Sequence, residues 1–431
     1  MSKEENRKNF SKYVSQNILG MIGFSCYVLA DSYFISIAKG ADGLTALNLV
    51  MPLYSIIFSI GEMIGVGSAI RYAISKIKKD ADADDYFWNA IIWCIMSSMI
   101  FVFAGIFFSS DIMRVLGADE HIVAVGNNYT KIFMCFAPMF MCNYVTNAFV
   151  RNDGAPGIAM SATLFSSLFN IVFDYILMFP MNLGMEGAAL ATALSPIIGM
   201  GICSIHFFSK KSSVRLVVCK PSVRKLVAGS QLGVSAFVGE MSSAVITLAF
   251  NFVILKLTGN VGVAAYGVVA NIAIVTTAVF NGVAQGSQPL ISSCFGRGDK
   301  DGCTQLKRMG YTTAFVLAAV MYSILFIFAE QFVAVFNSEG SEMLRLYATE
   351  GVKLYFIGIF FAGINIVGGG AFSATEDAFK AAVVSVARGF VLILGAVFVM
   401  SALFGMTGVW LAYAVAEGIT TFIMLVMVLR V

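Results

Sequence analysis

The chain has 431 residues, of which 58% are hydrophobic and only 12% are charged. Soluble domains are about a quarter charged, so this composition, with a mean hydropathy of +0.84, argues against a water-soluble enzyme. The 38 Phe and 15 Tyr exclude a disordered chain, and a net charge of +3 is too small to indicate a nucleic-acid partner. The sequence is therefore that of an integral membrane protein.

Apolar windows separated by charged residues or by Gly, Pro and Asn follow one another along the whole chain. A membrane span needs about 20 apolar residues, so the length allows about 36 residues for each of twelve spans with its connection. This leaves no room for a soluble domain. The predicted spans lie near 13–38, 44–70, 86–108, 122–149, 157–179, 187–208, 227–256, 261–292, 310–329, 343–371, 379–402 and 407–429.

The distribution of positive charge predicts the orientation of these spans, because cytoplasmic loops carry an excess of Lys and Arg. With the N-terminus inside, the inside segments hold 22 of the 28 Lys and Arg residues. The outside segments hold the rest, which are Lys39, Arg114, Lys131, Lys256, Arg345 and Lys353. We therefore expect a multi-pass protein of the cell (plasma) membrane with both termini in the cytoplasm.

One motif occurs twice. Gly184-Met-Glu-Gly187 matches Gly405-Met-Thr-Gly408 at an offset of 221 residues. The same offset relates two further glycine pairs, Gly61 with Gly282 and Gly65 with Gly286. A single shared offset indicates two six-helix halves with the same membrane orientation. The alternative is that small-residue motifs recur by chance in membrane helices.

The repeat predicts an all-α polytopic membrane protein with twelve transmembrane helices in two six-helix bundles, related by pseudo-twofold symmetry along the membrane normal. The bundles are an N-lobe (residues 1–208) and a C-lobe (residues 227–431), joined by a basic cytoplasmic linker (209–226). We interpret the positive charge of the linker as a topology signal, with specific lipid binding as the alternative. Duplicated halves around a central cavity are a common transporter plan, with alternating access by rocking of the halves.

Ionisable side chains inside a span are costly and are therefore candidates for function. Asp31, Asp174 and Thr192 each lie about 8–10 Å below the predicted outer boundary, at about 1.5 Å per residue. Asn170 lies about one turn from Asp174 on the same helix face. Two carboxylates forced together in a low dielectric do not both stay charged, so one is protonated or both share a cation such as sodium. This is the chemistry that an ion-coupled transporter needs.

The repeat provides a control for this cluster. The residues that match Asp31, Asn170, Asp174 and Thr192 in the second half are Phe252, Val391, Gly395 and Tyr413. Because the second half keeps none of the polar residues, we expect coupling to belong to the N-lobe. The alternative is a polar clamp that holds the first, fifth and sixth helices together.

The second half carries rare acids of its own. Glu240 lies about midway along the predicted helix 227–256, where it is expected to attract a cationic substrate or carry a proton; a hydrogen bond to a neighbouring helix is the alternative. Asn251 lies about three turns later, and Glu417 lies in the middle of the last helix. Arg388 is interpreted as a snorkelling or paired structural charge. Glu62 is expected to pair with Arg71 or another cytoplasmic base.

Enzymatic chemistry lacks support in the sequence. It contains no Ser/His/Asp order, HExxH, Walker loop or DDxxD pair, and its eight cysteines form no CxxC motif. His121 and His206 lie far apart at span edges and make no metal site. We therefore expect a protein that is not an enzyme, with no catalytic residue and no cofactor.

Two helices resemble those of a known family. Met51-Pro52 with Gly61-x-x-x-Gly65-x-Gly67 resembles the second helix of multidrug and toxic compound extrusion (MATE) transporters. The run GVAQGSQPLI from Gly282 to Ile291 resembles the eighth. The resemblance covers about residues 10–431.

The ion-site pattern resembles one branch of that family. Asn170-x-x-x-Asp174, followed by Gly187-Ala-Ala-Leu-Ala-Thr192, is similar to the N-lobe pattern of the DinF-like, MepA-like branch. Asp31 falls where that branch carries a first-helix aspartate, and Glu240 falls where many members carry an acid in the seventh helix. Some members bend the first helix at a proline, but residues 13–38 contain none.

The resemblance implies two V-shaped bundles and rocker-switch export of organic cations driven by protons or sodium. It implies that Asp31, Asn170, Asp174 and Thr192 bind the coupling cation, as metal ligands if that cation is Na+, and that Glu240 serves substrate or proton. We place Asn251, Gln285 and Glu417 in the same substrate or proton group.

The sequence thus predicts a multidrug antiporter that exports organic, mainly cationic compounds in exchange for H+ or Na+. We expect a monomer in the lipid bilayer whose partners are small-molecule drugs. The alternative is a lipid-linked or polysaccharide exporter of the related flippase superfamily. Against it, the sequence offers no evident cluster of basic residues for a pyrophosphate, since Lys and Arg lie almost wholly at the predicted cytoplasmic edges.

Overall fold

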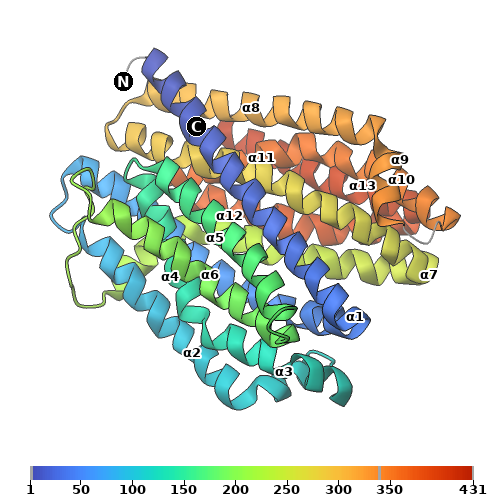
Figure 1. The fold of residues 1–431 in the computed structure, drawn as a ribbon. Helices are drawn as coiled ribbons and strands as arrows, with labels where there is room; N and C mark the ends of the chain where they lie inside the picture. The colour runs from blue at the N-terminus through green and yellow to red at the C-terminus, as the bar shows by residue number, and fades with distance from the viewer. Residues whose placement is uncertain (1–2, 338–340, 430–431) are drawn as a thin grey trace.

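The computed structural model describes residues 3–337 and 341–429, which form long helices joined by short connections (Figure 1). Arg430, one of the 22 Lys and Arg residues of the predicted inside segments, lies outside the described residues. The first half of the chain contains α1 (Lys3–Lys78), α2 (Asp85–Val115), α3 (Glu120–Cys135), α4 (Ala137–Asn152), α5 (Pro156–Met178) and α6 (Gly184–Phe207). The second half contains α7 (Val223–Gly296), α8 (Lys300–Ile327), α9 (Ala329–Phe336), α10 (Glu342–Tyr355), η1 (Phe356–Gly358), α11 (Ile359–Ala374), α12 (Ala378–Val386), η2 (Ala387–Val391) and α13 (Leu392–Leu429).

The described helices supply twelve membrane spans. Nine are long and apolar enough to cross a membrane, and α3 with α4 forms a tenth span bent by 46°. Two of the nine, α7 and the stretch Ala378–Leu429, are each broken at a glycine and so supply two spans apiece. The breaks lie at Gly259 (φ 67°) and Gly405 (φ 57°), and α1 breaks in the same way at Gly40 (φ 57°). Glycine is favoured at such positive φ values because it lacks a Cβ atom.

Buried hydrophobic side chains divide the molecule into two bundles. One large cluster runs from Ile35 to Leu232, and another runs from Ala249 to Ala416 and takes in Phe10 and Val14 of α1. We call the bundle of α1–α6 the N-lobe and that of α7–α13 the C-lobe. The predicted twelve-helix, two-bundle fold is therefore confirmed.

The backbone repeats from one bundle to the other. Gly184 and Gly405, which the sequence offset pairs, both have positive φ, 52° and 57°. The breaks at Gly40 and Gly259 also match each other, although they lie two residues away from the common offset. The internal repeat therefore includes the positions of helix starts and helix breaks as well as the amino-acid sequence.

The first and ninth predicted helices begin too late. The first was placed from residue 13, but α1 is helical from Lys3, and Asn6 of this extension donates a hydrogen bond to Gln305 Oε1 at 3.2 Å. The ninth was placed from residue 310, but α8 begins at Lys300, where Asp299 caps it by accepting from the Gly302 amide at 2.8 Å. Hydropathy marks only the apolar part of a helix, whereas caps and tertiary contacts fix its true end.

Glycines bring the two lobes into close contact at one end of the molecule, where α1 begins and where the linker runs (left in Figure 1). We call it the linker end. A Cβ atom on Gly67 would lie 2.1 Å from the Gly229 carbonyl oxygen, and one on Gly233 would lie 2.0 Å from that of Met63. A second seam joins α1 to the later part of α7, where a Cβ on Gly282 would lie 2.6 Å from Ile18 Cα. Small residues allow such close backbone contact between membrane helices.

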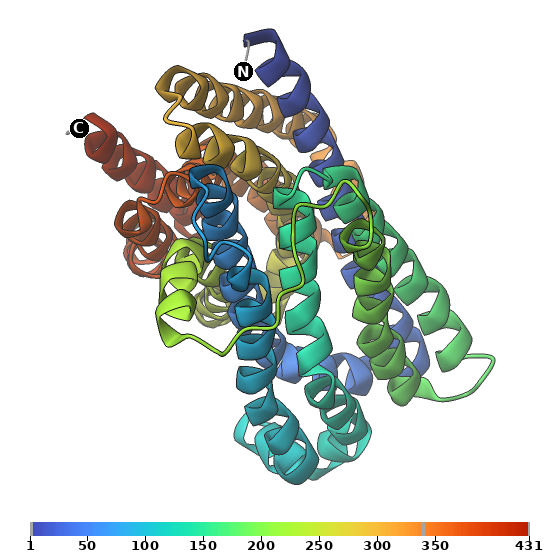
Figure 2. The same cartoon turned by 90° about the vertical axis from the view of Figure 1, so that its left-hand side faces the viewer.

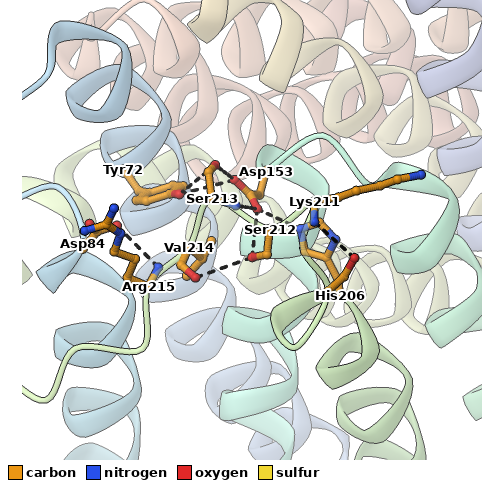
Figure 3. Close-up of polar contacts among 10 residues, drawn as sticks. Tyr72, Asp84, Asp153, His206, Lys211, Ser212, Ser213, Val214 and Arg215 are labelled. Atoms are coloured by element: carbon orange, nitrogen blue, oxygen red, sulfur yellow. Dashed lines mark hydrogen bonds and ion pairs between the residues drawn. The ribbon is translucent and has the colours of Figure 1, made fainter.

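The linker between the lobes crosses the helix ends and is held to the N-lobe by Asp153. Figure 2, seen from the linker end, shows this segment running from α6 across to the start of α7. Asp153 accepts hydrogen bonds from His206 Nε2 (2.8 Å), from the Ser213 amide (2.9 Å) and from the Ser212 hydroxyl (3.2 Å), as Figure 3 shows. The Tyr72 hydroxyl also donates to Asp153, at 3.3 Å. The aspartate, buried at 2% side-chain exposure, therefore fastens the linker to α1, α4 and α6.

Candidate functional site

The four predicted coupling residues come together inside the N-lobe. Asp31, Asn170, Asp174 and Thr192 are all buried, Asp174 and Asn170 completely. With its nitrogen facing Asp174, the Asn170 amide donates to Asp174 Oδ2 at 3.1 Å and accepts from Thr192 Oγ1 at 3.2 Å. This amide orientation satisfies both neighbours at once. Helices α1, α5 and α6 thus contribute to one polar site.

The two carboxylates of this site are incompletely satisfied. Asp31 and Asp174 lie close enough for their negative charges to repel each other. Within the described residues, Oδ1 of each is buried and accepts no hydrogen bond. Because buried polar atoms are nearly always paired, two orphaned oxygens in one site indicate a place for a proton or a cation.

Three tyrosines surround the carboxylates. The hydroxyls of Tyr54 and Tyr129 hydrogen-bond to each other, and both residues lie within electrostatic range of Asp31 and Asp174. Tyr27 interacts electrostatically with Asp31 as well as with Glu240. Tyr27 also lines the central cavity, so it is a neighbour of both the carboxylate site and that cavity.

A cavity lies between the lobes. Its empty space is about 1740 Å³, including the part open to solvent. Both lobes line it, with aromatic side chains such as Phe24, Phe58 and Tyr144 and a set of charged and amide side chains. The charged and amide residues are Asn17, Glu62, Asn143, Asn147, Arg151, Glu240, Asn281, Gln285, Gln288, Asn365 and Arg388. A cavity that combines aromatic walls with polar and charged groups suits small organic molecules that carry both kinds of surface.

Glu240 lines this cavity, as the sequence predicted, and lies near a second acid. It interacts electrostatically with Glu62 of the N-lobe and with Tyr144. Each lobe therefore contributes one acid to the cavity lining, Glu62 from the N-lobe and Glu240 from the C-lobe.

Gln285 joins the lobes beside these acids. Its Oε1 accepts from Arg151 Nη1 at 2.6 Å, and its Nε2 donates to Glu62 Oε1 at 3.2 Å. Of the two expected kinds of partner for Glu62, Arg71 is excluded, because it pairs with Glu376 of the C-lobe, and another base of the predicted cytoplasmic side takes its place. Arg151, not Arg71, is the base within electrostatic range of Glu62.

Comparison with known proteins decides the family. The family model MatE matches residues 17–176 and 236–399, which is more than half of the chain. This chain belongs to the MATE family.

Relatives and solved structures agree with this assignment. The multidrug export protein MepA of Staphylococcus aureus is 27% identical over 414 residues, covering 93% of this chain and 89% of MepA. MepA of Staphylococcus saprophyticus is 26% identical over 410 residues with the same coverage. An outward-facing multidrug resistance MATE family transporter of the MOP superfamily superposes with a TM-score of 0.92 at 20% identity, over 99% of this chain and 96% of that one.

A further solved structure shares the fold. It is a MOP superfamily transporter from Pyrococcus furiosus, with a TM-score of 0.90 at 19% identity over 98% of this chain and 95% of that one. Its binding pocket is described as having reverse polarity, which suggests a different function for that protein. The MATE fold alone therefore does not fix what a cavity carries.

The remaining predicted residues of this MATE protein, Asn251 and Glu417, are not among the described residues that line the cavity. Glu417 is buried and paired with Arg388. Among the described residues, no group of three or more His, Cys, Asp and Glu side chains is placed to hold a metal ion. Any Na+ in the N-lobe would depend on amide and hydroxyl oxygens as well as on two carboxylates.

Sequence reasoning missed several residues of the MATE cavity and site. Arg151 was counted only as a loop charge, yet it is buried and lines the cavity. Tyr27, Tyr54 and Tyr129 were not singled out, because fifteen tyrosines in an apolar chain carry no positional signal. The position of Tyr27, four residues and one helical turn before Asp31, is the signal that could have found it.

Proposed function

We propose that this MATE protein is a secondary active exporter of organic, mainly cationic compounds, driven by exchange with H+ or Na+. The observation that carries the proposal is the buried pair Asp31 and Asp174, each with an orphaned oxygen. An uncompensated charge in the protein interior costs several kcal/mol, so the pair recruits a proton or a cation from solution. A cation that the protein must take up and can release is what an antiporter exchanges.

In this proposal each N-lobe residue has a role. Asp31 and Asp174 take the proton, or ligate Na+ through carboxylate oxygens, which are ligands that hard cations prefer. Asn170 and Thr192 hold Asp174 in place through the amide network described above and complete the oxygen-rich site. The protein requires no resident cofactor.

The substrate occupies the cavity between the lobes. Glu240 attracts the positive charge of an organic cation, while Phe24, Phe58 and Tyr144 contact its apolar part. Gln285 and the neighbouring Glu62 contribute polar contacts at the same level. Asn251 and Glu417 have no direct part in substrate binding in this proposal.

Transport proceeds by rocker-switch alternating access of a monomer in the plasma membrane. The basic linker and its neighbouring loops make the linker end the cytoplasmic end, with both termini inside. The lobes meet at that end along the glycine seams, so this conformation is closed to the cytoplasm. In this state, protonation or Na+ binding at Asp31 and Asp174 favours release of the substrate to the outside, and the return to the opposite state then carries the cation inward.

A binding competition tests the proposal. Binding of ethidium, a monovalent organic cation, to purified protein is measured at increasing Na+ concentration and, separately, at decreasing pH. We expect one of these cations to raise the ethidium dissociation constant in the wild type and not in Asp31→Asn/Asp174→Asn. An ethidium affinity that neither cation changes in the folded wild type would contradict ion exchange.

One observation, the presence of two arginines in the cavity lining, supports the alternative function of a lipid-linked sugar exporter. Arg151 and Arg388 line the cavity, although the sequence placed the basic residues almost wholly at the edges. Guanidinium groups recognise phosphate, which favours export of a lipid-linked sugar. Each of these arginines has an acid nearby, Glu62 and Glu417 respectively, which reduces that attraction. Displacement of ethidium by a polyprenyl pyrophosphate at micromolar concentration would favour this alternative.

A further inference from the structure

The C-lobe contains a buried acid whose surroundings differ from those of the N-lobe acids. Glu417 has a side-chain exposure of 3% and is paired with Arg388, whose Nη2 lies 2.7 Å from Glu417 Oε1. Arg388 Nε lies 3.1 and 3.2 Å from the two carboxylate oxygens. Asn365 Nδ2 donates to Oε2 at 2.7 Å, and Thr421 in turn donates to Asn365 Oδ1 at 3.0 Å. Both oxygens of Glu417 therefore have partners.

By the internal repeat, this network occupies the position in the C-lobe that is equivalent to the coupling site in the N-lobe. Thr192 on α6 corresponds to Tyr413 on α13, and Glu417 lies one turn after Tyr413. The N-lobe site draws its carboxylates from α1 and α5 and has two orphaned oxygens. The corresponding region of the C-lobe has one carboxylate and a guanidinium that neutralises it.

A local change of the helix positions Arg388. Residues Ala387–Val391 form a π-helical turn between α12 and α13, a feature that often marks functional positions in helices. Within this turn, Gly389 lies against α7, where a Cβ atom would be 2.6 Å from Ser242 Cβ. The turn carries Arg388 to the cavity wall while its guanidinium bonds to Glu417. Tyr355 and Tyr413 are the titratable neighbours beside the pair.

We propose that Arg388 is a built-in cation that neutralises Glu417 permanently and so confines ion coupling to the N-lobe. An arginine is not deprotonated in proteins and cannot leave its site, so a carboxylate paired with it needs no cation from solution. Arg388 thereby sets how many cations are exchanged for each substrate. This inference rests on the proposed function, since it concerns the stoichiometry of ion exchange.

Removing Arg388 should create a second exchangeable site. In Arg388→Gln, Glu417 is left as a buried carboxylate and takes up H+ or Na+ instead. A ligand that binds only the folded state raises its stability, so the thermal unfolding temperature, Tm, is measured against Na+ concentration and against pH. We expect the Tm rise of Arg388→Gln with the effective cation to be about twice the wild-type rise. A rise no larger than that of the wild type would overturn the proposal.

Two control variants separate this role from a structural one. Arg388→Lys keeps the positive charge, and Arg388→Gln/Glu417→Gln removes both charges. We expect each variant to show the same Tm rise as the wild type. We also expect each to exchange the same number of ions per substrate as the wild type. Loss of coupled transport in the folded double variant would mean that the pair itself takes part in coupling, which also contradicts the proposal. A wild type whose Tm responds to neither cation would instead contradict the proposed function, so the two failures are distinguishable.

Discussion

At the scale of single residues, function depends on which buried carboxylates have a partner of their own. Glu417 is fully satisfied by Arg388 and Asn365, whereas Asp31 and Asp174 each keep an oxygen without a hydrogen bond. The same residue type therefore has different chemistry in the two lobes. Removing one member of a satisfied pair is costly, because it leaves a buried charge, whereas an unsatisfied acid is free to exchange its cation.

Glu240 gives the first prediction. Glu240→Gln removes the negative charge from the cavity but keeps the shape of the side chain. We expect the affinity for a monovalent cation such as ethidium to fall by about 10- to 100-fold, since a charged contact contributes about 1.5–3 kcal/mol. Binding of an uncharged drug of similar size should change less than twofold.

The matched control for Glu240→Gln is Glu330→Gln, which removes an exposed acid of α9 far from the cavity. Fluorescence titration of the purified variants measures both affinities. If Glu240→Gln lowered the affinities for the cationic and the uncharged ligand equally, the role of Glu240 would be structural.

How much of the site the sequence could reveal depends on the distance between partners along the chain. The N-lobe cluster was predictable because depth and helix periodicity are local properties, and Asn170 and Asp174 lie one turn apart. The Arg151–Gln285 contact joins residues 134 positions apart on different lobes, and no local pattern indicates it. For the same reason the sequence could not decide between Arg71 and another cytoplasmic base as the partner of Glu62; Arg71 pairs with Glu376, and Arg151 is the base near Glu62.

At the scale of helices, the glycine seams determine how closely the lobes approach. Gly233→Ala would place a Cβ atom 2.0 Å from the Met63 carbonyl oxygen, so the helices must separate. Forcing extra volume into close packing costs about 1–3 kcal/mol. We expect a clear fall in the Tm of the purified protein.

Gly267→Ala in the same helix is the control, because nothing lies within 4 Å of its added Cβ. Alanine is the better helix former by about 1 kcal/mol, so this variant should be as stable as the wild type or slightly more so. If both variants unfold at the same temperature, the seam is looser than the structure indicates.

The linker gives a second prediction at this scale. Asp153→Ala removes the common acceptor of His206, Ser212, Ser213 and Tyr72, so the linker is no longer fastened to the N-lobe. We expect trypsin to cut between Lys210 and Arg215 at least about tenfold faster, because proteolysis follows the population of locally open states. Gel electrophoresis of the fragments follows the rate.

Asp111→Ala is the control for the linker, since this exposed aspartate lies at the opposite end of the molecule and pairs only with Arg114 among the described contacts. Its cleavage rate should equal that of the wild type. An Asp153→Ala linker that trypsin cuts no faster would show that other contacts hold it.

The sequence predicted the helices well and their ends less well. Apolar windows marked the membrane-spanning parts, but the extensions from Lys3 and from Lys300 are polar and are held by contacts such as Asn6 with Gln305. The common offset of 221 residues does not pair the breaks at Gly40 and Gly259, because these two glycines lie 219 residues apart. The backbone conformation therefore repeats at more positions than the amino-acid sequence does.

At the scale of the whole molecule, the lobes, the cavity and the carboxylate site form one connected system. Tyr27 interacts electrostatically with Asp31 and lines the cavity, and Gln285 bridges the lobes beside Glu62. Contacts between the lobes at the linker end include the glycine seams and the pairing of Arg71 and Lys78 with Glu376. A change of charge at Asp31 and Asp174 can therefore bias the packing of the lobes around a shared cavity.

The most direct test of the account is uptake of ethidium into proteoliposomes under an imposed proton gradient and then under a sodium gradient, with wild type and Asp174→Asn side by side. The account predicts gradient-driven uptake by the wild type under one of the two gradients and loss of that uptake in the variant, which remains folded because the amide keeps the shape of the side chain. Asp111→Asn, the same change at an exposed site, should transport normally. Undiminished gradient-driven uptake by Asp174→Asn would contradict coupling in the N-lobe.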